Sequence, residues 1–160
     1  MPHRRSDPTK QFQAVDDLLQ RWLKERRTLL TRYTEIVVVN DSAIPDAALV
    51  QRQKDLCSVL VDYVSAGHFE VFHELLNEAE SFADGSGTLA ATVMPAIGDT
   101  TEVILAYEEK YGAGQYDPET LERDLSALGE VLESRFVRED RLIAGLHNSH
   151  RRQAEDLTPG

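Results

Sequence analysis

Apolar residues recur at steps of three and four along most of this 160-residue chain, and this spacing constrains the fold more than any other feature. In the segment from Pro8 to Val39 they form one stripe that includes Phe12, Val15 and Trp22. An α-helix has about 3.6 residues per turn, so side chains at these steps share one face. The pattern therefore predicts amphipathic helices, each with a stripe that must be buried.

Helix-breaking residues divide the chain into five such segments. The predicted helices cover 8–39, 46–66, 69–82, 88–111 and 117–146. Short connections place consecutive helices side by side in opposite directions. The predicted fold is all-α, an antiparallel helical bundle of about five long helices. Residues 1–160 are interpreted as a single helical domain, ordered from about 8 to 150, with a polar C-terminal tail over 151–160.

Three glycines carry structural predictions. Gly129 and Gly145 lie inside the last predicted helix, where Gly is less favourable than Ala by about 1 kcal/mol. We expect this cost to be offset by close contact with neighbouring helices. Gly67 follows the second apolar stripe and is predicted to end that helix, since Gly is the commonest residue just past a helix C-terminus.

The composition favours a cytoplasmic protein. With 28% charged residues, the chain has no apolar run near the roughly 20 residues that a membrane span needs. The basic leader at Arg4 and Arg5 is not followed by an apolar stretch, so no secretory signal is expected. The only cysteine, Cys57, cannot form an intrachain disulfide or a thiolate zinc cluster.

The net charge of -11 is unevenly distributed. The stretch from Asp55 to Glu109 holds 11 acidic residues and no Lys or Arg. Such a surface repels phosphate, so we expect no direct binding to nucleic acid or to an anionic membrane. A basic protein partner would be attracted by the same field, although acidity can also serve solubility alone. The sequence shows no clear self-complementary patch, so self-association is left open.

Motifs for chemistry are sparse, and the chain is not expected to be an enzyme or to need a cofactor. Glu70 and His73 form one Glu-x-x-His unit, but a di-metal bundle site needs two such units, so no metal is predicted. His147 and His150 share a face near a helix C-terminus, where capping is the favoured interpretation. His68 or His73 could serve a phosphorelay domain, but the acidic surroundings disfavour a phosphoryl group.

The helix over 46–66 carries a second, polar face opposite the apolar stripe of Leu56, Leu60 and Tyr63. This face continues beyond Gly67 to an aromatic residue, and its members are Asp55, Ser58, Asp62, Ser65 and Phe69. It is either an interaction surface or a buried, satisfied polar network. Arg135 and Glu139, four residues apart, could likewise be an ordinary surface ion pair.

Three segments of the sequence closely resemble the Rsd/AlgQ family of bacterial anti-sigma factors. They are DLLQRWL at 17–23, LVDYVSAGHF at 60–69 and LESRFVREDRLI at 132–143. The resemblance covers about residues 11 to 150 and implies an all-helical bundle that binds region 4 of the primary sigma factor of RNA polymerase. In the family this keeps sigma from core enzyme and from the -35 promoter element, favours alternative sigma factors when growth slows, and in the AlgQ branch promotes virulence-associated genes.

The resemblance also implies which residues lie at or behind the sigma-binding surface. They are Asp62, Tyr63, Ser65 and Phe69, with Arg21, Trp22, Arg135 and Glu139 nearby. Region 4 is a basic helix-turn-helix module, which suits an acidic partner. The chain departs from the family pattern in the segment 36–50, in its basic leader and in its tail. A helical phosphorelay or metal-binding protein is the alternative.

Overall fold

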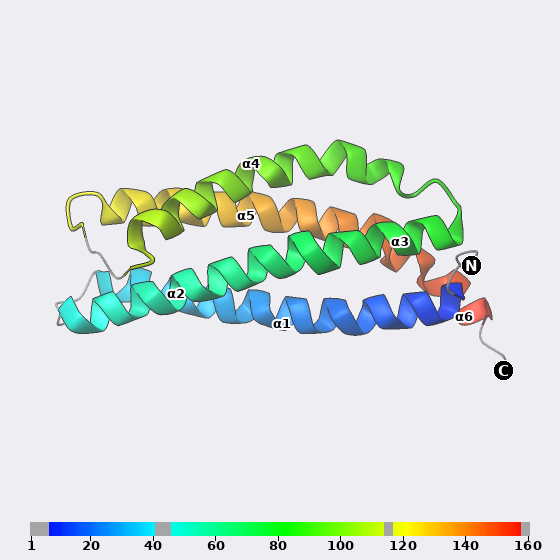
Figure 1. Ribbon diagram of the computed structural model, residues 1–160, viewed down its shortest axis with the longest axis horizontal. Coiled ribbons are helices and arrows are strands. Elements are labelled where there is room, and N and C mark those ends of the chain that lie inside the picture. Colours follow the sequence, from blue (N-terminus) through cyan, green and yellow to red (C-terminus); the bar gives the residue numbers. More distant parts are fainter. Residues whose placement is uncertain (1–6, 41–45, 114–116, 158–160) are drawn as a thin grey trace.

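The computed structural model describes residues 7–40, 46–113 and 117–157, and all its regular elements are helical (Figure 1). The elements are α1 (Pro8–Asn40), α2 (Asp46–Ala66), a π-helical turn (Gly67–Val71), α3 (Phe72–Phe82), α4 (Thr88–Tyr111), α5 (Leu121–Leu146), a 3-10 turn (Asn148–His150) and α6 (Arg151–Leu157). The chain reverses direction after α1, after α3 and after α4, while α2 and α3 run in the same direction. The predicted all-α antiparallel bundle is confirmed.

The number of long helices differs from the prediction, because α2 and α3 are joined into one rod. Gly67 does not end α2; the backbone passes through the π turn and continues as α3. A Cβ atom on Gly67 would lie 2.9 Å from Cζ2 of Trp22, which is itself buried. The glycine is therefore needed for close approach of α1. Among the described residues the bundle has four long rods instead of five.

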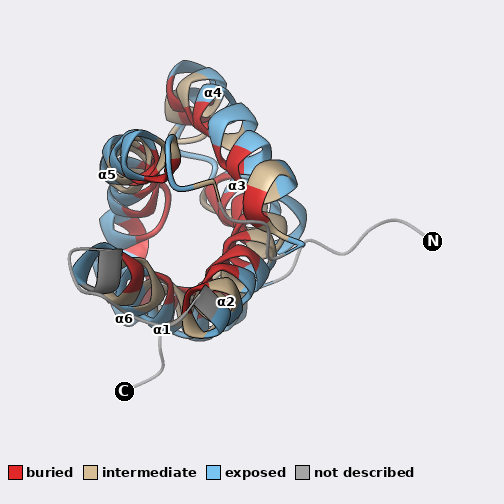
Figure 2. Cartoon of the chain, turned by 90° about the vertical axis from the view of Figure 1, so that its left-hand side faces the viewer, coloured by how far each residue is buried: buried red, intermediate tan, exposed pale blue. Residues whose placement is uncertain are grey.

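The buried residues lie on the sides of the helices that face the middle of the bundle, as the cartoon coloured by burial shows end-on (Figure 2). The α2–α3 rod packs against α1, α4 packs against α5, and α2 also touches α4. The apolar stripes predicted from the sequence supply this core. Leu29, Leu56, Leu60, Ile104 and Leu128 are all fully buried.

The two glycines inside α5 lie at close helix contacts, as predicted. A Cβ atom on Gly129 would lie 2.2 Å from the hydroxyl oxygen of Tyr33 in α1. A Cβ atom on Gly145 would lie 2.4 Å from Cδ2 of Leu89 in α4. Each missing side chain leaves room for one from a neighbouring helix.

Three boundaries differ from the sequence interpretation. The last long helix begins at Leu121, after a turn at 117–120, and not at Asp117. Residues 151–157, interpreted as part of a polar tail, form α6, which packs against α1 and buries Ala154. The Val-rich end of α1 buries Ile36 but exposes Val37 and Val38. The basic leader, the predicted loop at 41–45 and the tail's last residues, 158–160, lie outside the described residues.

Within the described residues, α4 is the one helix that is long and apolar enough to cross a membrane by length and composition, with a mean hydropathy of 1.3. Core helices of soluble bundles satisfy the same criterion, so this is weak evidence. Here α4 contributes Val93, Ile97 and Ile104 to the common core. The expectation that the chain has no membrane anchor stays a prediction.

Candidate functional site

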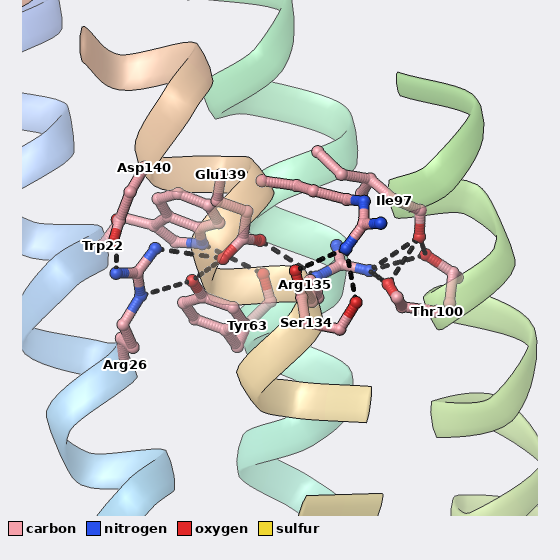
Figure 3. A network of polar contacts seen from close by, with 11 residues as sticks. Trp22, Arg26, Tyr63, Ile97, Thr100, Ser134, Arg135, Glu139 and Asp140 are labelled. Carbon is pink, nitrogen blue, oxygen red and sulfur yellow. Dashed lines mark hydrogen bonds and ion pairs between the residues drawn. The ribbon is translucent and has the colours of Figure 1, made fainter. Parts of the chain in front are cut away.

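A charged network crosses the interior of the bundle at mid-height, and Glu139 of α5 is at its centre (Figure 3). The Glu139 side chain has no solvent exposure. Its Oε1 accepts a hydrogen bond from the Tyr63 hydroxyl at 2.5 Å and pairs with Arg26 Nη2 at 3.1 Å. Its Oε2 accepts from Arg135 Nε at 2.9 Å. One carboxylate therefore links α1, α2 and α5.

Arg135 extends the network to α4. Its Nη1 donates to Thr101 Oγ1 at 2.7 Å, to Thr100 Oγ1 at 3.1 Å and to the Ile97 carbonyl at 3.4 Å. Arg135 is 1% exposed, so these partners replace water around a buried guanidinium. The sequence alternative of an ordinary surface pair between Arg135 and Glu139 is wrong, because both are inside the bundle.

Arg26 joins the network to the surface of α1 and α5. Its Nε donates to the Tyr63 hydroxyl at 3.0 Å, and its Nη1 pairs with Asp140 at 2.7 Å. Its guanidinium lies 4.7 Å from the Phe136 ring centre, a cation–π arrangement. Arg26 was not among the residues selected from the sequence, although its position four residues after Trp22 places it on the same inward side of α1.

Burial and charge act in opposite directions on this network. Burial raises the pKa of Glu139 above its ordinary value, although Arg135 and the Tyr63 hydroxyl oppose the increase. Burial and the nearby Glu139 carboxylate raise the pKa of Tyr63, so its hydroxyl stays a proton donor. The arrangement can hold helices in register.

Aromatic packing fixes the α1–α2 side of the network. The rings of Trp22 and Tyr63 stack with centres 4.6 Å apart, and Trp22 Nε1 donates to the Tyr63 carbonyl at 3.1 Å. Phe72 meets Trp22 edge-on, and Phe136 meets Tyr63 edge-on. Such pairs contribute about 0.5 to 1.5 kcal/mol beyond their buried area. This packing determines how α2 and the π turn sit on α1.

The eight residues selected from the sequence separate into two groups of four. Trp22, Tyr63, Arg135 and Glu139 are buried in the network. The other four lie outside it on α1, α2 and the π turn. These are Asp62 and Arg21, which are exposed, Ser65, which is half-buried, and Phe69, which is 74% exposed. We call this second group the Phe69 surface.

The surroundings of the Phe69 surface are acidic, because Glu25 and Glu70 join Asp62 and outnumber Arg21. Burial and the charges of Asp62 and Glu70 raise the pKa of Glu25 on the neighbouring helix, so these three carboxyl groups share one region. Among the described residues the Asp62 carboxylate forms no hydrogen bond or ion pair. The alternative that this polar face of α2 forms a buried, satisfied network is wrong, because Ser58, Asp62 and Phe69 are exposed; the buried network meets α2 on its opposite side. The buried polar network includes Tyr63, and the exposed polar face carries Asp62.

Four histidines were considered for metal or phosphoryl chemistry. His68 and His73 are exposed, as is Glu70. His147 and His150 are buried and bonded to carboxylates, so the capping interpretation for this pair is wrong. Within the described ranges no group of three or more His, Cys, Asp or Glu side chains is arranged to hold a metal ion.

The fold and this site define an antiparallel helical bundle whose rods are fixed by a buried arginine–carboxylate network beneath an acidic, aromatic face. Residues 1–147 match the family described as Regulator of RNA polymerase sigma(70) subunit, Rsd/AlgQ. The chain belongs to this family, which confirms the resemblance carried by the three sequence segments.

Curated relatives are named Regulator of sigma D. One from Salmonella arizonae is 34% identical over 141 residues, which is 84% of this chain and 85% of the relative. One from Yersinia pseudotuberculosis is 29% identical over 147 residues, or 89% and 87% of the two chains. One from Yersinia enterocolitica is 28% identical over the same length, or 89% and 88%. No solved structure matches the chain.

Proposed function

We propose that this protein is an anti-sigma factor that binds region 4 of the primary sigma factor and keeps it from core RNA polymerase and the -35 element. It acts by binding, without catalysis, in the cytoplasm where the polymerase is found. Membership of a family described as regulators of the sigma(70) subunit supports the assignment. The relatives named Regulator of sigma D support the same partner.

The single observation that carries the proposal is the exposure of Phe69 within an acidic surrounding. An aromatic side chain that is 74% exposed gains free energy when a partner covers it. Asp62, Glu25 and Glu70 beside it complement a basic partner. Region 4 is a basic helix-turn-helix module, so its charge is opposite to that of this acidic surface. It also offers grooves between helices for an aromatic anchor.

The buried residues act as positioning residues in this proposal. Trp22 and Tyr63 fix the α1–α2 contact, and Arg135 and Glu139 fix α5 and α4 against it. The Phe69 surface is therefore carried on a framework whose geometry is set before binding. Preorganisation of this kind reduces the entropy that binding must overcome.

Competition with DNA follows from the proposed partner surface. The DNA-reading face of region 4 is its most basic surface, and an acidic protein there would replace the phosphates of the -35 element. We expect region 4 bound by this protein to lose affinity for -35 DNA. Equal binding to free and DNA-bound region 4 would show that the two surfaces do not overlap.

The test is titration of purified region 4 with the parent protein, with Phe69→Ala and with Leu105→Ala. Leu105 is 47% exposed on α4, away from the Phe69 surface, and serves as the matched control. We expect Phe69→Ala to weaken binding at least tenfold, the range of an anchor residue, and Leu105→Ala to leave it unchanged. Unchanged binding by Phe69→Ala would remove Phe69 from the interface. Failure of the parent protein to bind region 4 would overturn the assignment.

A further inference from the structure

A second buried cluster of charged groups closes one end of the bundle, and the proposed function does not use it. It consists of His147, His150, Glu78, Asp16 and Asp84, and we call it the histidine clamp. Both imidazole side chains and the Glu78 side chain are buried, with at most 1% exposure. Buried groups of this kind are retained when every polar atom finds a partner.

The geometry of the clamp places a carboxylate at every ring nitrogen. Glu78 bridges the two rings, with Oε1 at 2.5 Å from His147 Nδ1 and Oε2 at 2.7 Å from His150 Nδ1. Asp16 Oδ1 lies 2.8 Å from His147 Nε2, and Asp84 Oδ2 lies 2.8 Å from His150 Nε2. Three of these distances are those of charge-assisted hydrogen bonds, and the contact between His147 Nδ1 and Glu78 is shorter still.

These contacts set a requirement for protons. An ionised carboxylate only accepts hydrogen bonds, and a neutral imidazole carries one N–H. Two carboxylate partners on one ring therefore need both ring nitrogens to be protonated. The hydrogen bonds of His147 and His150 are complete when both rings are imidazolium cations.

The charge balance of the cluster leads to the same state. The charged groups packed around the rings are Asp16 and Arg151, which are paired at 3.0 Å, together with Glu78 and Asp84. With both rings protonated, three cations face three carboxylates. With both rings neutral, three carboxylates face the single cation Arg151, which is costly at the fully buried Glu78. The Ser86 hydroxyl, 3.2 Å from His150 Nε2, is the one uncharged polar partner from the α3–α4 turn.

Aromatic rings cover the imidazole faces. Phe12 of α1 stacks on His147 with ring centres 4.2 Å apart, and Phe82 of α3 stacks on His150 at 4.3 Å. A cation over an aromatic face is favoured, most strongly when water is excluded. The two phenylalanines therefore shield the hydrogen bonds and also favour the protonated rings.

The clamp connects segments that are far apart in the sequence. Asp16 belongs to α1, Glu78 to α3 and Asp84 to the turn before α4. His147 directly follows the last residue of α5, and His150 ends the 3-10 turn that leads directly into α6. We propose that the histidine clamp is a pH-sensitive latch: protonated His147 and His150 fasten the 3-10 turn and α6 to the bundle, and loss of their protons releases this segment.

The direction of the pH dependence follows from the proton requirement. Imidazole is the side chain whose charge changes between about pH 5 and 8. Loss of one N–H proton from either ring removes a hydrogen bond to a buried or half-buried carboxylate. A lone pair of the ring nitrogen then faces a lone pair of the carboxylate oxygen. The latch is therefore closed while both rings are protonated and opens as rising pH removes their protons. Hydrogen bonds from His147 and Arg151 outweigh burial and lower the pKa of Asp16, which keeps that partner ionised in mild acid.

The first test needs no variant. Nitrogen-15 NMR of the imidazole rings separates imidazolium from the neutral tautomers, and hydrogen–deuterium exchange of the backbone amides reports protection of the segment 148–157. We expect imidazolium signals from both rings at pH 6, and protection factors in this segment at least tenfold lower at pH 8.5 than at pH 6. A neutral ring at pH 6, or protection that does not change with pH, would overturn the proposal.

The second test uses a histidine pair on the same protein. His150→Gln removes a proton-dependent link, while His73→Gln changes an exposed histidine on α3. We expect His150→Gln to reduce the pH dependence of protection in the segment 148–157, because only the His147 half of the clamp then remains, and His73→Gln to retain it in full. If His150→Gln does not fold, Glu78→Gln, which keeps the size of the bridging side chain, replaces it with the same expected reduction. Retention of the full pH dependence in a folded clamp variant would contradict the proposal.

Discussion

The Tyr63 hydroxyl donates a hydrogen bond of 2.5 Å to Glu139 Oε1 across the bundle, from α2 to α5. The two residues are 76 positions apart in the sequence, and neither side chain reaches solvent. The bond therefore fixes the relative positions of two rods that are not consecutive. Arg26 and Arg135 contact the same carboxylate, so its loss would leave the buried Arg135 without a carboxylate partner among the described residues and Arg26 with Asp140 alone.

We expect Glu139→Ala to lower the free energy of unfolding by about 3 to 5 kcal/mol, the cost of removing one partner from a buried ion pair. The measurement is urea denaturation followed by circular dichroism. The adjacent Asp140 pairs with Arg26 but has a largely exposed side chain, so Asp140→Ala is the matched control. An exposed pair contributes at most about 1 kcal/mol. Similar losses in both variants would contradict the central role given to Glu139.

Gly67 and Gly98 test the packing of the π turn. A Cβ atom at Gly67 would meet the buried Trp22 ring, whereas nothing lies within 4 Å of a Cβ atom at Gly98 in α4. We expect Gly67→Ala to lower the free energy of unfolding by about 1 to 3 kcal/mol, as overpacking does. Gly98→Ala should raise it by roughly 0.5 to 1 kcal/mol through helix propensity. Urea titration of both variants is sufficient, and stabilisation by Gly67→Ala would show that the rods are less closely packed there.

The pH dependence of stability contains a contribution from Asp124. Burial disfavours its ionisation, but hydrogen bonds from Lys110 at 2.8 Å and Tyr111 at 2.6 Å outweigh this and lower the pKa of Asp124 below the ordinary value of 3.8. A folded-state pKa below the unfolded one stabilises the protein at higher pH, and this stabilisation is lost as the pH falls through the folded-state value. Most of it is therefore lost in strongly acidic solution.

Asp124→Asn should therefore be less stable than the parent at pH 6, by about 0.5 to 1 kcal/mol because the pair is partly exposed. This difference in the free energy of unfolding should disappear in strongly acidic solution, because Asp124 of the parent is then uncharged as well. Urea midpoints measured from pH 2 to pH 7 give the comparison. Glu122→Gln, which changes an exposed carboxyl two residues earlier on α5, is the control, and its urea midpoint should follow that of the parent at each pH. A constant difference at every pH would assign the effect of Asp124→Asn to packing instead of charge.

Apolar spacing was sufficient to predict the helices, because each rod buries one stripe and the 3.6-residue period is visible in the sequence. Gly67 was wrongly predicted to end its helix. In a sequence, a glycine that ends a helix cannot be distinguished from one that makes room for a tryptophan of a neighbouring helix. The same reasoning also missed the side of α2 on which polar groups are buried. Tyr63 was correctly placed on the core stripe, but the charged groups that meet its hydroxyl come from α1 and α5.

The contacts of the charged side chains are the part of the candidate site that could not be predicted from the sequence. Arg135 and Glu139 have the spacing of a surface pair, and only the packing of four rods shows that this pair is inside. His147 and His150 have the spacing of a helix cap, yet their carboxylate partners come from α1, α3 and a turn. Contacts between distant segments carry no local signal. Asp62 and Phe69 could be selected in advance because a distinctive family segment contains both.

The sharpest prediction for the proposed function is at Asp62. This carboxylate is exposed, close to Glu25, and without a hydrogen bond or ion pair among the described residues. Reversal to Arg should therefore leave the bundle folded while it replaces attraction by repulsion at a basic partner. We expect Asp62→Arg to weaken binding to sigma region 4 by at least tenfold, which corresponds to about 1.4 kcal/mol. The parent complex should weaken as salt rises, because screening reduces the attraction between exposed charges.

Circular dichroism and binding measured on the same Asp62→Arg sample separate the possible roles of the residue. Retained helicity with lost binding is the expected result and places Asp62 in the contact. Lost helicity would make the residue structural, against its exposure. The matched control is Glu130→Arg, an equal charge reversal at an exposed position of α5. If both reversals weaken binding equally at low salt, the effect belongs to the overall charge of -11 and not to the Phe69 surface.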